Sequence, residues 1–289
     1  MKLERFKYWE REASGEEWEV EPLTFGRFNL VVGRNATGKT RLLKAIARVA
    51  AEISGESRTT RNMRFELEVD SRGEDAKAEW ARQTQYWPFS AEMNFRSFKR
   101  EAVSYENVAD VFLRGTKSFG PGFEEEVRAR LNEVGYEAEE LSALEQSGAA
   151  RIEVRQAGRG AMTPLRKLSQ AQQRTLTLLT YVTLLERSKI PATLLVDDFA
   201  EGLDFESAGR LTTAVLKIAE AAPLQFIIAT NDRYVMNLVP LEFWTVLVDD
   251  TTRTRVFNYA NSKQKFDDFK FTGLSNFDFF SMDFARHSA

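Results

Sequence analysis

The sequence predicts an α/β protein with a mainly parallel central sheet, and three observations support that prediction. Apolar runs of strand length alternate with helical segments between residues 151 and 258. A glycine-rich turn joins an apolar strand to an amphipathic helix between residues 28 and 53. A further apolar strand ends in two aspartates, Asp197 and Asp198. Alternating strands and helices favour parallel pairing, because parallel neighbours are joined by a crossover that is usually a helix.

Composition sets the limits for any function. The chain has 289 residues, 43% hydrophobic and 29% charged, which suits one large globular domain. Forty basic and 43 acidic residues give a net charge of −3, so net charge does not indicate nucleic acid as a partner. There is no cysteine, and the one histidine is His287. Disulfides, cysteine zinc sites, Ser-His-Asp hydrolases and histidine metal clusters are therefore excluded within this chain.

The N-terminal segment predicts an antiparallel β part followed by the first helix. Residues 1–32 have strand character and end in the apolar run 28–32. The helix is expected from about Gly38 to Ile53, with apolar side chains at helical spacing and a stop at Ser54-Gly55. The N-terminus lacks the apolar region of a signal peptide, and no apolar run approaches the roughly 18 residues that span a bilayer. We expect a cytoplasmic protein with no membrane partner.

The middle of the chain is expected to form an insertion. Phe65, Leu67 and Val69 alternate as in a strand. From residue 81 the pattern is mixed, with a Gly120-Pro121-Gly122 break and an acidic stretch at 124–145. We predict an inserted, mostly helical lid subdomain over residues 81–150 within a single domain of residues 1–289.

The last part of the chain returns to α/β order. Helices are expected at 169–185 and 205–220, and buried strands at 194–196, 226–228 and 246–248. The tail, residues 259–289, contains seven phenylalanines. We expect it to pack on the core or on a partner, since seven exposed phenylalanines would form a large apolar patch.

The strongest motif is the run from Gly33 to Thr40, Gly-Arg-Asn-Ala-Thr-Gly-Lys-Thr, which matches the phosphate-binding P-loop pattern in full. The preceding strand and following helix supply the context that the motif needs. Glycines let backbone N–H groups turn toward phosphate, and the helix N-terminus adds partial positive charge. Lys39 is expected to reach the β- and γ-phosphates, and Thr40 to bind Mg²⁺.

The second motif is the strand Leu194-Leu195-Val196 ending in Asp197-Asp198, a Walker B pattern. Asp197 would lie at the carboxyl edge of the sheet and help hold Mg²⁺, while Asp198 would orient or deprotonate the attacking water. Together with the P-loop, this pattern predicts a nucleotide triphosphate site.

Three further segments make the chain resemble the ABC-type P-loop ATPases. Residues 168–174, Leu-Ser-Gln-Ala-Gln-Gln-Arg, resemble the family's signature. Residues 201–204, Glu-Gly-Leu-Asp, resemble its D-loop, and residues 229–232, Ala-Thr-Asn-Asp, occupy the place of its switch loop. The resemblance covers roughly residues 25–235 and includes small bacterial ATP-binding proteins akin to SMC heads, recombination-repair ATPases and the ATPase domain of OLD-type nucleases.

The resemblance implies a fold, a reaction and an assembly. The fold is an ABC-type domain with a mainly parallel central sheet, an N-terminal antiparallel part and a helical lid. The reaction is Mg²⁺-dependent hydrolysis of ATP by a head-to-tail homodimer or higher oligomer, with the partner's copy of Ser169 touching the γ-phosphate. The cofactor-binding residues carried over are Gly33, Arg34, Asn35, Ala36, Thr37, Gly38, Lys39, Thr40, Arg41, Ser169, Ala171, Gln172 and Asp204. The catalytic residues are Asp198, Lys39 and Asn231, and the metal-binding residues are Thr40, Asp197 and Gln85.

Three departures from the family pattern suggest slow hydrolysis. Ala171 replaces the signature glycine, Asp198 replaces the usual glutamate, and Asn231 replaces the usual histidine. The shorter carboxylate lies farther from the attacking water, and an asparagine cannot carry a proton at neutral pH. A slow ATPase suits a sensor or regulatory subunit whose separate effector protein does the downstream chemistry, and anti-phage defence is one setting for such a pair.

Other features leave alternatives open. Gln83 or Gln85 could be the family's Q-loop glutamine, and Tyr8, Trp9 or Trp18 could stack on adenine or pack in the core. The run 95–100, Phe-Arg-Ser-Phe-Lys-Arg, and the arginines Arg58, Arg61 and Arg64 could grip nucleic acid or simply be solvated. The alternatives to a regulatory ATPase are a DNA repair or chromosome-handling ATPase and a nucleotide-gated scaffold. A transporter subunit fits less well, because residues 81–146 show no clear Q-loop.

Overall fold

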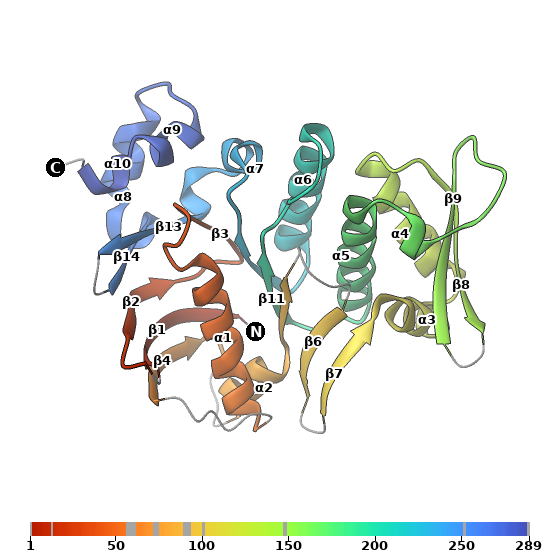
Figure 1. Cartoon of the computed structure of the whole chain (residues 1–289), viewed down its shortest axis with the longest axis horizontal. Coiled ribbons are helices and arrows are strands. Elements are labelled where there is room, and N and C mark those ends of the chain that lie inside the picture. Colours follow the sequence, from red (N-terminus) through yellow and green to blue (C-terminus); the bar gives the residue numbers. More distant parts are fainter. Residues whose placement is uncertain are drawn as a thin grey trace.

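The structure is a computed structural model that describes residues 2–12, 14–55, 62–71, 75–88, 94–99, 102–146, 149–250 and 253–287. Figure 1 shows one large twisted sheet, the helix α1 (Lys39–Ser54) beside it, and a second, smaller sheet at the far end of the molecule. Arg58, Arg61 and Arg100, which were predicted as candidate contacts to nucleic acid, lie in the runs 56–61 and 100–101, outside the described residues.

The elements follow the order expected for an α/β protein. The strands are β1 (Leu3–Arg11), β2 (Glu17–Thr24), β3 (Phe28–Gly33), β4 (Asn62–Val69), β5 (Thr84–Pro88), β6 (Asn94–Lys99), β7 (Ala102–Asn107), β8 (Ala138–Gln146), β9 (Ala149–Gln156), β10 (Thr163–Pro164), β11 (Ala192–Asp197), β12 (Leu224–Ala229), β13 (Trp244–Asp250) and β14 (Arg253–Asn258). The helices are α1, α2 (Ala76–Arg82), α3 (Val108–Phe119), α4 (Pro121–Glu133), α5 (Gln170–Arg187), α6 (Phe205–Ala221), α7 (Arg233–Leu238), α8 (Tyr259–Lys270), α9 (Asn276–Ser281) and α10 (Phe284–His287), with short 3₁₀ turns at Leu165–Lys167 and Leu241–Phe243.

The large sheet confirms the predicted fold class. Its order is β4-β1-β2-β14-β13-β3-β12-β11-β5-β6-β7. The five strands from β13 to β5 are parallel to one another, and the N-terminal strands β1, β2 and β4 pair antiparallel. The carboxyl ends of β3 and β11 therefore lie near one another at one edge of the sheet, where ligands bind in open parallel sheets.

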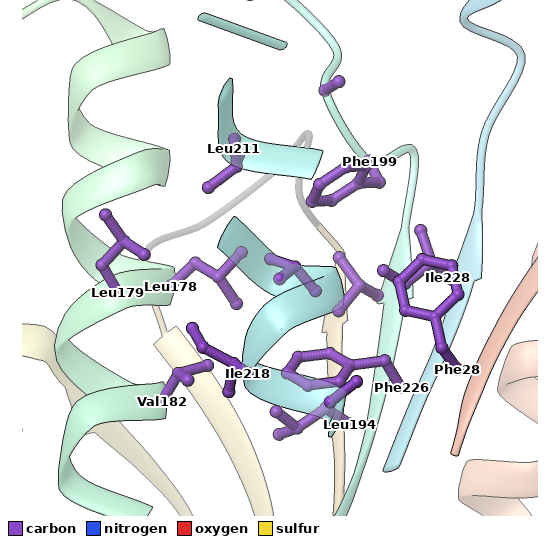
Figure 2. Packing of buried hydrophobic residues seen from close by; sticks show 14 of the residues in the cluster. Phe28, Leu178, Leu179, Val182, Leu194, Phe199, Leu211, Ile218, Phe226 and Ile228 are labelled. Atoms are coloured by element: carbon purple, nitrogen blue, oxygen red, sulfur yellow. The ribbon is translucent and has the colours of Figure 1, made fainter. Parts of the chain in front are cut away.

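The central strands are buried on both faces because helices cover each side. Along β3, Leu30 and Val32 pack into one apolar cluster while Val31 packs into another, and the same alternation holds in β11 and β12. Figure 2 shows the first cluster, where Leu194, Phe226 and Ile228 of the sheet meet side chains of α5 and α6. The second cluster joins the sheet to α1. This two-sided core explains why the strand sequences are continuously apolar rather than alternating.

The structure corrects the expectation of a mostly helical segment over residues 81–150. β5 joins the parallel sheet beside β11, and β6 and β7 extend that sheet as an antiparallel pair. Among the described residues between 83 and 150, only α3 and α4 are helical, and β8 forms a hairpin with β9. The mixed sequence pattern hid these strands, because short strands carry little periodic signal. The helices α3 and α4 pack against α5 at the right of Figure 1.

The C-terminal tail, residues 259–287 of the described chain, packs on the sheet rather than standing apart. Phe266, Phe269 and Phe279 are at most 1% exposed and belong to the larger apolar cluster. Phe271, by contrast, is 89% exposed.

None of the helices in the described residues has the length and apolar character that crossing a membrane requires.

Candidate nucleotide-binding site

The P-loop has the backbone geometry that its glycines predict. At Gly33 a β-carbon would lie 2.9 Å from the Leu247 carbonyl oxygen, so β13 leaves no room for a side chain. Gly38 has φ of 95° and caps α1, a conformation that glycine adopts without strain. α1 is 16 residues long, and its N-terminal N–H groups face the loop with the partial positive charge of the helix dipole.

Lys39 lies inside the loop. It is 8% exposed, and its Nζ donates to the carbonyl oxygens of Gly33 (2.7 Å) and Arg34 (3.2 Å). Burial lowers the pKa of Lys39, while the carboxylates of Asp198 and Asp197 act against that shift. The Lys39 ammonium group donates here to two neutral carbonyl oxygens at a helix N-terminus. A phosphate would accept stronger hydrogen bonds from the same group, because the phosphate oxygens are negatively charged.

Thr40 and Asp197 meet at the carboxyl edge of β11. The Thr40 hydroxyl donates to Asp197 Oδ1 at 3.1 Å, and the Tyr86 hydroxyl donates to Oδ2 at 3.2 Å. Asp197 is 3% exposed, and burial raises the pKa of its carboxyl group despite these two hydrogen bonds. Burial and the neighbouring Asp197 also raise the pKa of Tyr86. A hydroxyl and a carboxylate side by side are the oxygen donors that Mg²⁺ prefers, so the residues fit that ion.

A cavity of about 600 Å³ opens in front of the P-loop. Lys39, Thr40, Asp198 and Asn231 all line it. Asp198 has φ of 53°, in the left-handed region that aspartate tolerates better than most residues. Asn231 donates from Nδ2 to Asn35 Oδ1 at 3.1 Å. Asp198 and Asn231, which were assigned catalytic roles from the sequence, therefore line the same cavity as Lys39 of the P-loop.

The signature-like segment starts α5 but does not line this cavity. Ser169 caps α5: its hydroxyl accepts from the Gln172 N–H (3.2 Å), and its own N–H donates to Gln172 Oε1 (3.1 Å). Ser169 is exposed and Ala171 is half-buried. α5 is an 18-residue helix whose described contacts include α3 and α4, whereas α1 packs against the central strands. The exposed N-terminus of α5 is thus available to a phosphate held by another molecule.

The D-loop-like segment has a clear local role. Asp204 caps α6, where its Oδ1 accepts from the N–H groups of Glu206 and Ser207 and its Oδ2 accepts from the Ser207 hydroxyl. The hydrogen bonds from Ser207 are the main reason that the pKa of Asp204 is lowered. Arg174 of α5 donates to the Glu201 carbonyl at 2.7 Å, which ties the signature helix to this loop.

The side chains of two predicted residues lie away from the cavity at the P-loop. Gln85 is paired with Leu194 in the sheet register, whereas the edge of the sheet is at Asp197 and Pro88. Three strand residues separate Gln85 from that edge, a distance of about 10 Å. Gln85 is not among the residues that line the cavity, so this geometry does not support its assignment as a metal ligand. The Arg34 side chain turns to the tail and pairs with Asp283 at 2.7 Å, so only its backbone lies in the loop.

Sequence reasoning missed several residues around the cavity. Tyr86 follows Gln85, and strand alternation points its side chain to the opposite face of the sheet, where its hydroxyl reaches Asp197. The cavity also has a charged end lined by Glu10, Glu12, Lys44 and Arg48. The spacing of residues 41, 44 and 48 along one face of α1 was the available signal, since residues three and four apart are neighbours on a helix.

Comparison with known proteins gives a fold but no sequence relative. No protein-family model matches the sequence, and no curated protein matches it. Among solved structures, an SMC head bound to the C-terminal winged-helix domain of ScpA aligns with a TM-score of 0.59 and 14% identity, over 91% of this chain and 99% of that one. The SMC head domain from Thermotoga maritima aligns at 0.52 and 16%, over 89% and 99%. An ATP-binding subunit of an ABC transporter aligns at 0.56 and 13%, over 97% and 99%. The chain therefore has the fold of an ABC-type P-loop ATPase.

Proposed function

We propose that the chain binds ATP and hydrolyses it with Mg²⁺, as a head-to-tail dimer. The observation that carries this proposal is the meeting of Thr40 and Asp197, 3.1 Å apart, beside Lys39 at the mouth of the P-loop. Thr40 and Asp197 are 157 positions apart in the sequence, and the fold brings together their oxygen atoms, which are suitable ligands for the Mg²⁺ of Mg·ATP. Mg²⁺ held there would neutralise the charge that develops on the phosphates.

The remaining residues would act on the nucleotide in named roles. Lys39 would hold the β- and γ-phosphates, Asp198 would orient or deprotonate the attacking water, and Asn231 would hydrogen-bond the γ-phosphate or that water. Because Asp198 is short and Asn231 carries no proton, we propose slow turnover. A rate equal to that of ordinary transport ATPases would refute this part of the proposal.

The position of Ser169 supports the proposed dimer. Its helix N-terminus is exposed and outside the cavity of its own subunit, so it can complete a site only in trans. In such a dimer each P-loop faces Ser169 of the other copy, with Asp204 at the same interface. ATP would hold the dimer closed by mass action, and hydrolysis would release it.

We assign this ATPase a regulatory role. The sequence has no cysteine and one histidine, which leaves few means for a second reaction in the same chain. A separate effector protein would therefore carry the output. Among the solved structures of this fold, one SMC head is bound to part of another protein, ScpA. A setting in anti-phage defence belongs to the same proposal and rests on fold-level analogy.

The first experiment measures ATP turnover and oligomeric state together, for the native chain, Lys39→Ala and Asp198→Asn. We expect Lys39→Ala to abolish binding and dimerisation, and Asp198→Asn to keep both while losing turnover. Lys270→Ala is the matched control, since this lysine pairs with Glu242 at 3.3 Å and lies outside the cavity. A native chain that binds no ATP would refute the proposal.

A mixing experiment tests the head-to-tail arrangement. Lys39→Ala disables a site through one subunit, and Ser169→Arg disables it through the other. Neither variant alone can build an intact site, but a dimer that combines the two has one intact site of its two. An equal mixture should therefore recover turnover that neither variant shows alone, up to about half of the native rate. If the mixture stays inactive, Ser169 does not act in trans.

A further inference from the structure

One end of the nucleotide cavity carries a charged cluster that no proposed catalytic step uses. Its members are Glu10 at the end of β1, Glu12 in the following loop, and Arg41 and Arg48 on one face of α1. They line the same cavity as Lys39, but they lie on the side of the N-terminal strands. A nucleoside triphosphate has a base and a ribose to accommodate beyond its phosphates, and this end of the cavity borders the P-loop.

Arg41 is held in a fixed plane. Its Nε donates to Glu10 Oε1 at 2.9 Å, and its Nη2 donates to Glu12 Oε1 at 3.0 Å. Its Cζ atom lies 4.7 Å from the centroid of the Trp18 ring, in cation–π contact. Trp18 is itself anchored, since its Nε1 donates to Thr254 Oγ1 at 2.9 Å. The guanidinium is therefore fixed along its edge and covered on one face, and its side chain remains 33% exposed.

The two carboxylates of this cluster offset its two guanidinium groups. Glu10 is 1% exposed and also accepts hydrogen bonds from Arg48 and from the Tyr8 hydroxyl. Lys44 lines the same end of the cavity and adds one positive charge beside the cluster. What Arg41 still offers is a flat surface, and planar guanidinium groups stack on bases as aromatic rings do.

The aromatic candidates from the sequence cannot take that role. Tyr8 is fully buried and Trp18 is 8% exposed beneath Arg41. Trp9 lies in a different pocket on the N-terminal sheet, where Arg64 stacks on it at 4.5 Å. Of these three rings, none presents a face to the nucleotide cavity.

We propose that Arg41 is the platform on which the nucleobase stacks. This inference rests on the proposed binding of nucleotide, and it adds the residue that receives the base. Stacking uses the π-face that every base has, so the platform does not distinguish adenine from guanine. ATP and GTP are expected to gain similarly from Arg41, and a bare triphosphate gains nothing from it.

The test compares Mg²⁺ complexes of ATP, GTP and inorganic tripolyphosphate by titration calorimetry, for the native chain and for Arg41→Ala. Arg41→Ala should weaken ATP and GTP by roughly 5- to 150-fold, the range for loss of one base stack, and leave tripolyphosphate within about twofold. Arg41→Lys keeps the positive charge beside Glu10 but not the plane, so it should show the same selective loss. Arg64→Ala, which removes the equivalent contact with Trp9, is the matched control and should change none of the three affinities.

The outcomes separate the possible errors. Equal losses for ATP and tripolyphosphate, with recovery in Arg41→Lys, would mean that Arg41 binds phosphate and would overturn the inference. Unchanged ATP affinity in a folded Arg41→Ala protein would place the base elsewhere and would also overturn it. If the native chain binds tripolyphosphate and ATP equally, the inference fails while the phosphate site stands. If it binds neither, the proposed function itself fails.

Discussion

The tail offers a direct test of whether the C-terminal phenylalanines belong to the core. Phe279 is fully buried, and its ring centroid lies 4.6 Å from Phe266, 5.1 Å from Phe269 and 6.3 Å from Trp244. Replacing a buried phenylalanine by alanine removes its transfer free energy and leaves a cavity, which together cost about 3–5 kcal/mol. Because α9 has six residues and can shift to fill part of the space, we expect about 3 kcal/mol.

The assay is denaturant unfolding followed by circular dichroism and tryptophan fluorescence, with the free energy of unfolding compared between variants. Phe271→Ala is the matched control, because this side chain is 89% exposed and its loss should cost under about 0.5 kcal/mol. A loss of about 3 kcal/mol is a large share of a typical stability of about 5–15 kcal/mol. If Phe279→Ala costs no more than Phe271→Ala, the tail is not part of the cooperative core, and our reading of its packing is wrong.

Three further predictions concern the site. Burial opposes the ionisation of Glu10, but the hydrogen bond from Arg41 and the charge of Arg48 hold the pKa of Glu10 below its usual value. Its stabilising effect should be present above the unfolded pKa of about 4.3 and be lost as the pH falls through the lower folded value. Glu10→Gln should therefore cost about 2 kcal/mol at pH 7, and this cost should shrink as the pH falls through the folded pKa of Glu10. A difference in unfolding free energy that stays constant as the pH is lowered would contradict it. Because burial raises the pKa of Asp197, ionising this carboxyl group costs more free energy in the folded chain than in the unfolded chain. Asp197→Asn should therefore raise the melting temperature without Mg²⁺ while removing the Mg²⁺ dependence of ATP binding. Calorimetry with and without Mg²⁺ checks this, and retained Mg²⁺ dependence would exclude Asp197 as a ligand. Asp198→Glu should raise turnover on the order of tenfold if the short carboxylate limits the reaction, and steady-state rates that stay level or fall would place the slow step elsewhere.

The sequence by itself determined the phosphate-binding machinery, because that machinery is local. The P-loop is a continuous run in which two glycines, a lysine and a threonine have fixed spacing, and Gly38 and Lys39 lie where the pattern puts them. The apolar runs around Leu30, Leu195 and Ile227 likewise predicted strands of a mainly parallel sheet, and all three side chains are buried in the structure. Helix boundaries were predictable where a capping side chain marks them, as at Ser169 and Asp204.

The tertiary structure decided everything that depends on strand register and on contacts between distant segments. Gln85 and Tyr86 are neighbours in sequence, yet alternation and register bring only the Tyr86 hydroxyl to Asp197. The sequences of β6 and β7 have too weak an alternation to be distinguished from helix. These strands form because they pair with each other and with β5 at the edge of the sheet, and this pairing is not visible in the sequence. The charged end of the cavity arises because β1 and α1, some thirty residues apart, pack so that Arg41 lies between Glu10 and Trp18. Such long-range pairs have no signature in one sequence, since each partner alone is an ordinary charged or aromatic residue.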